Sequence, residues 1–384
     1  MATVRVEVTP SVLTWAVERS GTAAADLEAK FPKLAQWEAG EAQPTFRQLE
    51  SLAKATHTAV GLLLLDRPPV DELPIPDLRT MADADVATPS PNLLETVESA
   101  EQRQEWYRSY LVETGQEPLP FVASVTRGDD PRIVAADMRA QLGFDIYERG
   151  SSWSDALTRL IDKAENAGVL VMVNGVVGNN VYRRLDPTEF RGFALADPYA
   201  PVVFINGSDT KAAQIFTLAH ELAHIWLGAS GVSNPWEPDE ERQATERWCN
   251  AVAAEFLVPE ELVRAAFDPT EPLPHLLDRL ARAYKVSTLV VLRRLHETGF
   301  LAAAEYRRAY RDELARVLQL LAEREGDSGG SFYTTLPRRV SKPFARALIS
   351  STLAGRDTYS EAFRLLGFRK TSALHELAAR LGVG

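Results

Sequence analysis

The chain has 384 residues, of which 45% are apolar and 25% charged, so it is long enough for two or three globular domains with a sizeable core. Its formal net charge of −11 argues against broad, nonspecific binding of nucleic acid by the whole chain. It has one cysteine, no apolar run long enough to span a membrane and no signal-like N-terminus, which favours a reduced, cytoplasmic protein without a membrane partner.

The first 70 residues predict a small helical module. Short apolar-stripe helices alternate with turns, and one motif stands out among them: Trp37-Glu38-x-Gly40, then Pro44-Thr45, then Leu49-x-x-Leu52-Ala53. This motif resembles the Cro/repressor-type (XRE) helix-turn-helix family. The resemblance implies a helix-turn-helix bundle over residues 1–70.

The partner of this module is open from the sequence. Lys33, Gln36 and Arg47 are the candidate contacts to DNA or to a partner protein. Pro32 shortens the helix that would enter the major groove, and residues 1–70 carry seven Lys and Arg against eight Asp and Glu. The alternatives are therefore DNA binding, protein docking and formation of a homodimer.

The rest of the chain predicts a mainly α fold with a small β-sheet (α+β). A proline-rich connector and a long helix occupy 71–130, a zincin-like domain 131–300 and a helical region 301–384. The sheet is expected from strands at 168–173, 191–196 and 201–206, and its edge could bind an extended peptide. Gly192 in the second strand is typical of a bulge or of close substrate approach.

A His-Glu-x-x-His motif follows this sheet. On a helix, His220 and His224 lie one turn apart and face the same way, and Glu221 lies beside them. Two neutral imidazoles of this spacing bind zinc, and the glutamate acts as general base on a water molecule there. The helix is expected to begin at a capping Ser208 or Asp209 and to end at Gly228. Without a metal, the motif would be two exposed histidines on an ordinary helix.

A catalytic zinc needs a third protein ligand, which the next helix should supply. Glu246 lies inside this helix, one turn before Asn250, whose amide could orient a ligand. Glu255 is the competing candidate. Cys249, on the same helix, is interpreted as a small buried residue, with a redox switch as the alternative.

These motifs together resemble the ImmA/IrrE family of metallopeptidase-like proteins. The resemblance rests on Phe204-Ile205-Asn206, on His220 to His224, and on Glu246-x-x-Cys-Asn250-x-x-Ala-Ala-Glu-Phe-Leu-Val-Pro259. It implies that His220, His224 and Glu246 hold Zn²⁺ and that Glu221 is the general base. Departures from the family pattern at Cys249, Val252 and Phe256 touch none of these residues. The last region, from 337 on, resembles the helical C-terminal part of longer family members.

The sequence thus favours a regulatory zinc endopeptidase, active or latent, that cuts a partner protein such as a repressor, as the resemblance implies. The alternative is a non-catalytic regulator or antitoxin-like protein that holds DNA or a toxin-like partner. An oxyanion donor could come from several side chains that sequence alone cannot place. These are His275, Arg293, Arg294, His296 and Tyr333.

Overall fold

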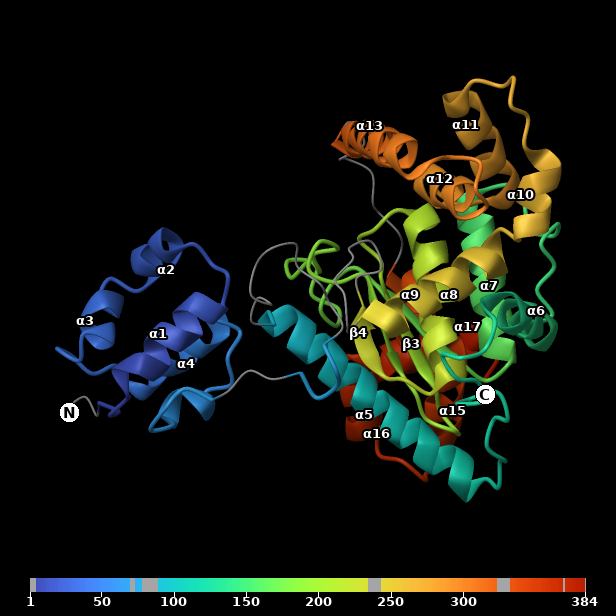
Figure 1. Ribbon diagram of the computed structural model, residues 1–384. Helices are drawn as coiled ribbons and strands as arrows, with labels where there is room; N and C mark the ends of the chain where they lie inside the picture. The colour runs from blue at the N-terminus through green and yellow to red at the C-terminus, as the bar shows by residue number, and fades with distance from the viewer. Residues whose placement is uncertain are drawn as a thin grey trace. The chain divides into compact units, whose positions relative to one another are not determined.

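The computed structural model describes residues 5–69, 73–77, 89–233, 243–322, 332–368 and 370–383 (Figure 1). The chain divides into two compact units. The smaller comprises Met1–Pro74 and Asp85–Glu98, and the larger comprises Ile75–Ala84 and Ser99–Gly384. In the described ranges, no helix is long and apolar enough to cross a membrane.

The smaller unit is a bundle of short helices. They are α1 (Pro10–Arg19), α2 (Ala24–Lys30), α3 (Leu34–Glu38), α4 (Phe46–Ala55) and the 3-10 helix η1 (Leu62–Leu64). Trp37 is buried in its core, and Thr45 caps α4 in a reciprocal capping box with Gln48. α3 follows Pro32 and has only five residues, a short helix as this proline led us to expect.

The larger unit is built around a four-stranded mixed sheet. Its strands are β1 (Leu170–Asn174), β2 (Gly192–Leu195), β3 (Val202–Asn206) and β4 (Gly231–Ser233), in the order β1-β3-β2-β4. β1 and β3 are parallel, whereas β2 is antiparallel to both β3 and β4. The first three strands confirm the expected ones. β4 was not expected, because three residues are too short to show a period.

Helices cover both faces of the sheet, which explains why its strands read as unbroken apolar runs. On one face, Val171, Val203 and Ile205 share a core with α7 (Trp153–Asn166) and α8 (Lys211–Leu227). On the other, α5 (Pro91–Glu113) reaches the sheet through Gln104, whose amide donates to the carbonyls of Leu195 (2.9 Å) and Ala200 (2.8 Å). The two central strands of the sheet, β2 and β3, are therefore buried between helices.

The remaining helices complete this unit and confirm a mainly α fold with a small sheet. α6 (Pro131–Leu142) and α9 (Gln243–Leu257) pack against each other, and α9 packs on α8. α10 (Glu260–Ala266), α11 (Leu273–Tyr284), α12 (Thr288–Glu297) and α13 (Ala303–Ala322) form the orange group in Figure 1. The chain ends with α14 (Phe332–Val340), α15 (Lys342–Leu353), α16 (Tyr359–Leu366) and α17 (Thr371–Leu381).

Candidate metal centre

The His-Glu-x-x-His motif lies on α8, a helix that is buried from Ala213 to Trp226. Thr210, not Ser208 or Asp209, caps this helix by accepting the backbone N–H of Ala213 (3.2 Å). Asp209 does not cap the helix, because its carboxylate forms an ion pair with Arg191 at 2.9 Å. The helix ends as expected at Gly228, which adopts a left-handed conformation.

His220 and His224 on α8 meet Glu246 on α9. The two Nε2 atoms are 3.1 Å apart. The Glu246 carboxylate lies 3.1 Å from Nε2 of His220 and 3.0 Å from Nε2 of His224. Both imidazoles are completely buried, so the alternative of two exposed histidines on an ordinary helix is wrong.

The donor set fits a divalent metal ion such as zinc. Two imidazole nitrogens and one carboxylate are the ligands of many catalytic zinc sites. In a tetrahedral site with bonds of about 2.0–2.1 Å, ligand atoms lie about 3.3 Å apart, close to the 3.0–3.1 Å separations here.

The protonation states of the cluster suit metal binding. Burial lowers the pKa of His220, which favours the neutral imidazole that a metal requires. Burial alone would raise the pKa of Glu246, but its contacts with the two imidazoles hold it well below its usual range. His220 therefore favours its neutral form, and Glu246 favours its ionised form.

Two polar residues surround these three side chains. Oδ1 of Asn250 lies 3.1 Å from Nδ1 of His220 and can fix the orientation of that ring, as its position one turn after Glu246 suggested. Ser233 at the end of β4 places its hydroxyl 3.5 Å from both His224 and Glu246. Sequence reasoning missed Ser233 because its strand carries no periodic signal.

Glu221 has a different environment from the three clustered residues. It is completely buried, and neither of its carboxylate oxygens has a hydrogen bond within the described residues. Burial and the charge of Glu246 raise its pKa well above the usual range, while the nearby Ser233 hydroxyl acts in the opposite direction.

Gly192 makes room for this carboxylate. A Cβ at this position would lie 2.6 Å from Cγ2 of Thr217, 2.8 Å from the carbonyl of Phe204 and 3.0 Å from Oε1 of Glu221. The residue pairs in regular register with Ile205 and Ser233, so the strand has no bulge there. The glycine is thus explained by close packing of α8 on the sheet.

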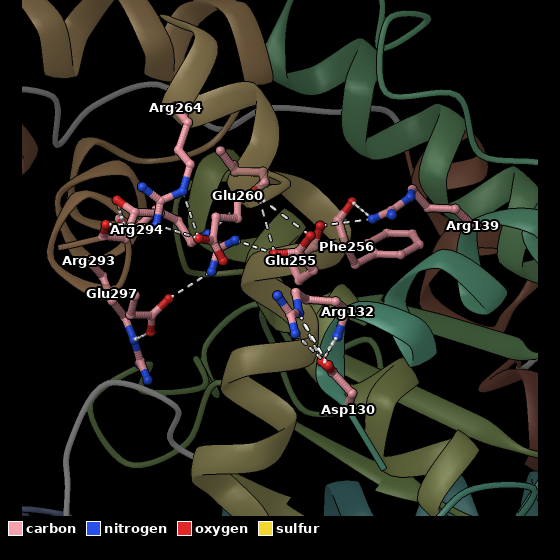
Figure 2. Close-up of polar contacts among 12 residues, drawn as sticks. Asp130, Arg132, Arg139, Glu255, Phe256, Glu260, Arg264, Arg293, Arg294 and Glu297 are labelled. Carbon is pink, nitrogen blue, oxygen red and sulfur yellow. Dashed lines mark hydrogen bonds and ion pairs between the residues drawn. The ribbon is translucent and has the colours of Figure 1, made fainter. Parts of the chain in front are cut away.

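Glu255 lies outside the cluster, in a group of arginines at the end of α9 (Figure 2). Its carboxylate pairs with the buried guanidinium of Arg294 and accepts the first backbone N–H of α10 at 3.2 Å. Arg139 donates to the carbonyl of Glu255 at 2.8 Å. Arg149 donates to the carbonyl of Leu257, the last residue of α9, and Arg294 donates to the carbonyl of Val258 at 2.9 Å. Three arginines therefore satisfy carbonyls where Pro259 prevents the helix from continuing.

The other residues named from sequence lie away from the cluster. Arg294 belongs to the arginine group, Arg293 forms an ion pair one turn along α12, and His296 faces the carbonyl of the following loop at 2.9 Å. His275 is exposed on α11, and the side chain of Tyr333 lies outside the described residues. None of the four described candidates contacts the metal-binding cluster.

In the smaller unit, Lys33, Gln36 and Arg47 are all exposed. Lys33 and Arg47 line one hollow of about 630 Å³, and Gln36 does not. Cys249 is fully buried beside the cluster, and burial raises the pKa of its thiol well above the usual range, as suits a small core residue.

The chain itself contacts the outer edge of β4. The backbone N–H of Val232 donates to the carbonyl of Pro76 at 3.0 Å, and Asp77 forms a parallel bridge with the same residue. Part of the connector thus occupies the edge of the strand that ends at Ser233. An extended peptide was expected to bind at an edge of the sheet, without one edge being specified.

Comparison with known proteins agrees with this geometry. Residues 164–296 match the family described as the IrrE N-terminal-like domain, and residues 340–380 match a domain of unknown function, DUF8813. The radiation response metalloprotease IrrE of Deinococcus radiodurans is 34% identical over 106 residues, which cover 26% of this chain and 32% of that protein. The protein of the same name from Deinococcus deserti is 36% identical over 106 residues, which cover 26% and 38%.

The chain thus spans only about a third of the length of these relatives. The matched family segment carries His220, Glu221, His224 and Glu246 on α8 and α9. Residues 164–296 are therefore similar in sequence to IrrE-type metalloprotease domains.

Proposed function

We propose that the larger unit is a zinc-dependent peptidase whose metal is held by His220, His224 and Glu246. The observation that carries this proposal is the buried carboxylate of Glu221, which has no hydrogen bond among the described residues and lies next to the clustered ligands. A purely structural zinc site needs only its ligands, and burying a further carboxylate without a partner is costly. A catalytic role explains why it is there.

The bound metal would supply the Lewis acid that polarises a peptide carbonyl and activates a water molecule. Glu221 would take the proton of that water and pass it to the leaving amine. Asn250 would hold the ring of His220 through Nδ1, so that Nε2 points at the metal. The hydroxyl of Ser233, which lies 3.5 Å from both His224 and Glu246, would contact the peptide group of the substrate beside the metal.

The substrate class we infer is a partner protein, such as a transcriptional repressor, cut within an extended segment. Support comes from the resemblance to ImmA/IrrE proteins and from the relatives that are named metalloproteases. An extended segment would pair with the outer edge of β4, which brings a peptide bond next to Ser233. Since Pro76 and Asp77 occupy that edge, we infer that the isolated chain is latent until they leave.

The proposal is tested by replacing Glu221 with glutamine, which keeps the size of the side chain and removes the base. Purified full chain in which residues 75–77 are replaced with Gly-Ser-Gly, so that the edge of β4 is open, is incubated with a peptide library prepared from a proteome, and new N-termini are counted by mass spectrometry. In this background, Glu221→Gln should retain zinc and lose cleavage, whereas Glu305→Gln, an exposed change on α13, should cleave like the parent chain. Equal cleavage by Glu221→Gln would overturn the mechanism.

A further inference from the structure

A groove of about 1040 Å³ lies at the other end of α8, away from the metal-binding cluster. It is lined by residues at and just beyond the carboxyl ends of the parallel strands β1 and β3, among them Asn174, Gly175, Gly207 and Ser208. In open sheets with parallel strands, ligands bind in the crevice outside these ends. Lys211, which lines the groove, precedes His220 by nine residues, about 14 Å along the helix.

The groove is strongly basic in a chain whose net charge is −11. Its lining contains the five cationic residues Arg184, Lys211, Arg338, Arg339 and Lys342, which come from segments distant in sequence. Asp155 is the one acidic residue among the lining side chains. This concentration of positive charge indicates a site for an anion.

Three of these cations have no carboxylate partner within the part of the chain that the structure describes. Arg338 donates to the hydroxyl of Thr158 (2.7 Å), Arg339 to the amide oxygen of Asn179 (3.3 Å), and Lys211 to an amide oxygen on its own helix (3.1 Å). These are all neutral acceptors, so the three charges are not compensated.

The acids near the groove are already engaged. Asp155 lies 3.5 Å from the side chain of Arg159, Asp162 pairs with Lys342 at 2.7 Å, and Asp209 pairs with Arg191 at 2.9 Å. Glu165 accepts the hydroxyl of Ser341 at 2.6 Å and the backbone N–H of Lys342 at 3.0 Å. Lys211 and Arg338 both line the groove, and burial together with the positive charge of Arg338 lowers the pKa of Lys211. A bound anion would relieve this repulsion.

The chemistry of the groove selects among anions. Arginine side chains bind phosphate oxygens in a forked geometry, and the exposed hydroxyl group of Ser154 adds a neutral donor. Val173, Val176 and Val181, which are half-buried or exposed, give the groove an apolar wall, against which an organic part of the ligand can lie. A volume of about 1000 Å³ is at the upper end of the range for small-molecule sites.

We propose that this groove binds a small molecule that carries at least two phosphate groups, such as a nucleoside di- or triphosphate, through Lys211, Arg338 and Arg339. The phosphates contact the three cations, and the remainder of the molecule lies along the apolar wall. The site does not depend on the peptidase activity, so it is tested by binding alone.

The experiment is isothermal titration calorimetry of the full chain with inorganic pyrophosphate and with ATP, in 50 mM and 300 mM KCl. Both compounds should bind the wild type, and binding should weaken at the higher salt concentration. The double variant Arg338→Ala/Arg339→Ala should bind roughly tenfold or more weakly, since two charge-assisted contacts are lost. Arg346→Ala, which removes an exposed cation outside the groove, should bind like the wild type.

Lys211→Ala guards against a folding defect in the double variant, because it changes a residue at the start of α8 whose side chain donates only to Gln214 among the described residues. It should also weaken both compounds. Two outcomes would overturn the proposal. They are no binding of either compound to the wild type, and equal binding by the wild type and both groove variants.

Discussion

Replacing Arg294 with methionine should destabilise the larger unit far more than the same change at its neighbour Arg293. The guanidinium of Arg294 is buried and pairs with the buried carboxylate of Glu255, each side chain being less than 10% exposed. Methionine keeps much of the volume but leaves the carboxylate without its ion pair. Breaking a buried pair from one side costs about 3–5 kcal/mol. Arg293 pairs with Glu297 at the surface, where such a pair contributes about 0–1 kcal/mol.

The coupling between the two partners gives a second quantity. Glu255→Gln alone should cost about 1–3 kcal/mol, because Arg294 keeps its contacts to Glu297 and to the carbonyl that follows α9. In Glu255→Gln/Arg294→Met no buried charge is left unpaired. The double variant should therefore cost less than the sum of the single changes by about 1–3 kcal/mol.

The assay is equilibrium unfolding in urea with a chelator present, so that bound metal does not contribute to the free energy. It compares the wild type, the three variants above and Arg293→Met. The reasoning is refuted if Arg294→Met and Arg293→Met cost the same, or if the two single changes add to within about 0.5 kcal/mol.

Further changes test other features of the larger unit. Burial raises the pKa of Glu165 from 4.5 to about 7. The folded state thus retains a proton that the unfolded state releases, and stability falls by up to about 3 kcal/mol as pH rises from 4.5 to 7. Glu165→Gln should remove this part of the slope, as thermal unfolding at several pH values would reveal; an unchanged slope would contradict it. Gly192→Ala should cost about 1–3 kcal/mol and weaken zinc binding, whereas Gly128→Ala, with no contact under 3.6 Å, should do neither. Equal effects of the two glycine changes in urea unfolding and zinc titration would argue against the close packing described. Replacing residues 75–77 with Gly-Ser-Gly should raise cleavage of the peptide library several-fold, and unchanged cleavage would argue against a blocked edge.

Much of the site could be predicted from sequence because it depends on local periodicity. Four-residue spacing places His220 and His224 on one face of any α-helix, and their apolar neighbours predict a buried one. The strands at β1 to β3 are apolar runs of four or five residues between turns, which is the usual signal of a covered sheet. In both cases the information lies within a few residues of chain.

Features that depend on distant segments could not be predicted in the same way. Ser233 reaches the cluster only because β4 pairs with β2, and a three-residue strand has no pattern to detect. Glu246 and Glu255 both lie on α9, and only the packing of α9 on α8 shows which one meets the histidines. The basic groove joins Lys211 to α14, which comes more than 100 residues later.

The central claim, a metal site made by His220, His224 and Glu246, is tested most directly by measuring zinc per chain by elemental analysis. The wild type, Glu246→Gln and Glu255→Gln are each dialysed against a competing chelator before measurement. Wild type and Glu255→Gln should retain about one zinc per chain, and Glu246→Gln should lose it, because a neutral carboxamide replaces its ionised ligand. Equal zinc in Glu246→Gln and wild type, or none in the wild type at all, would contradict the proposed site.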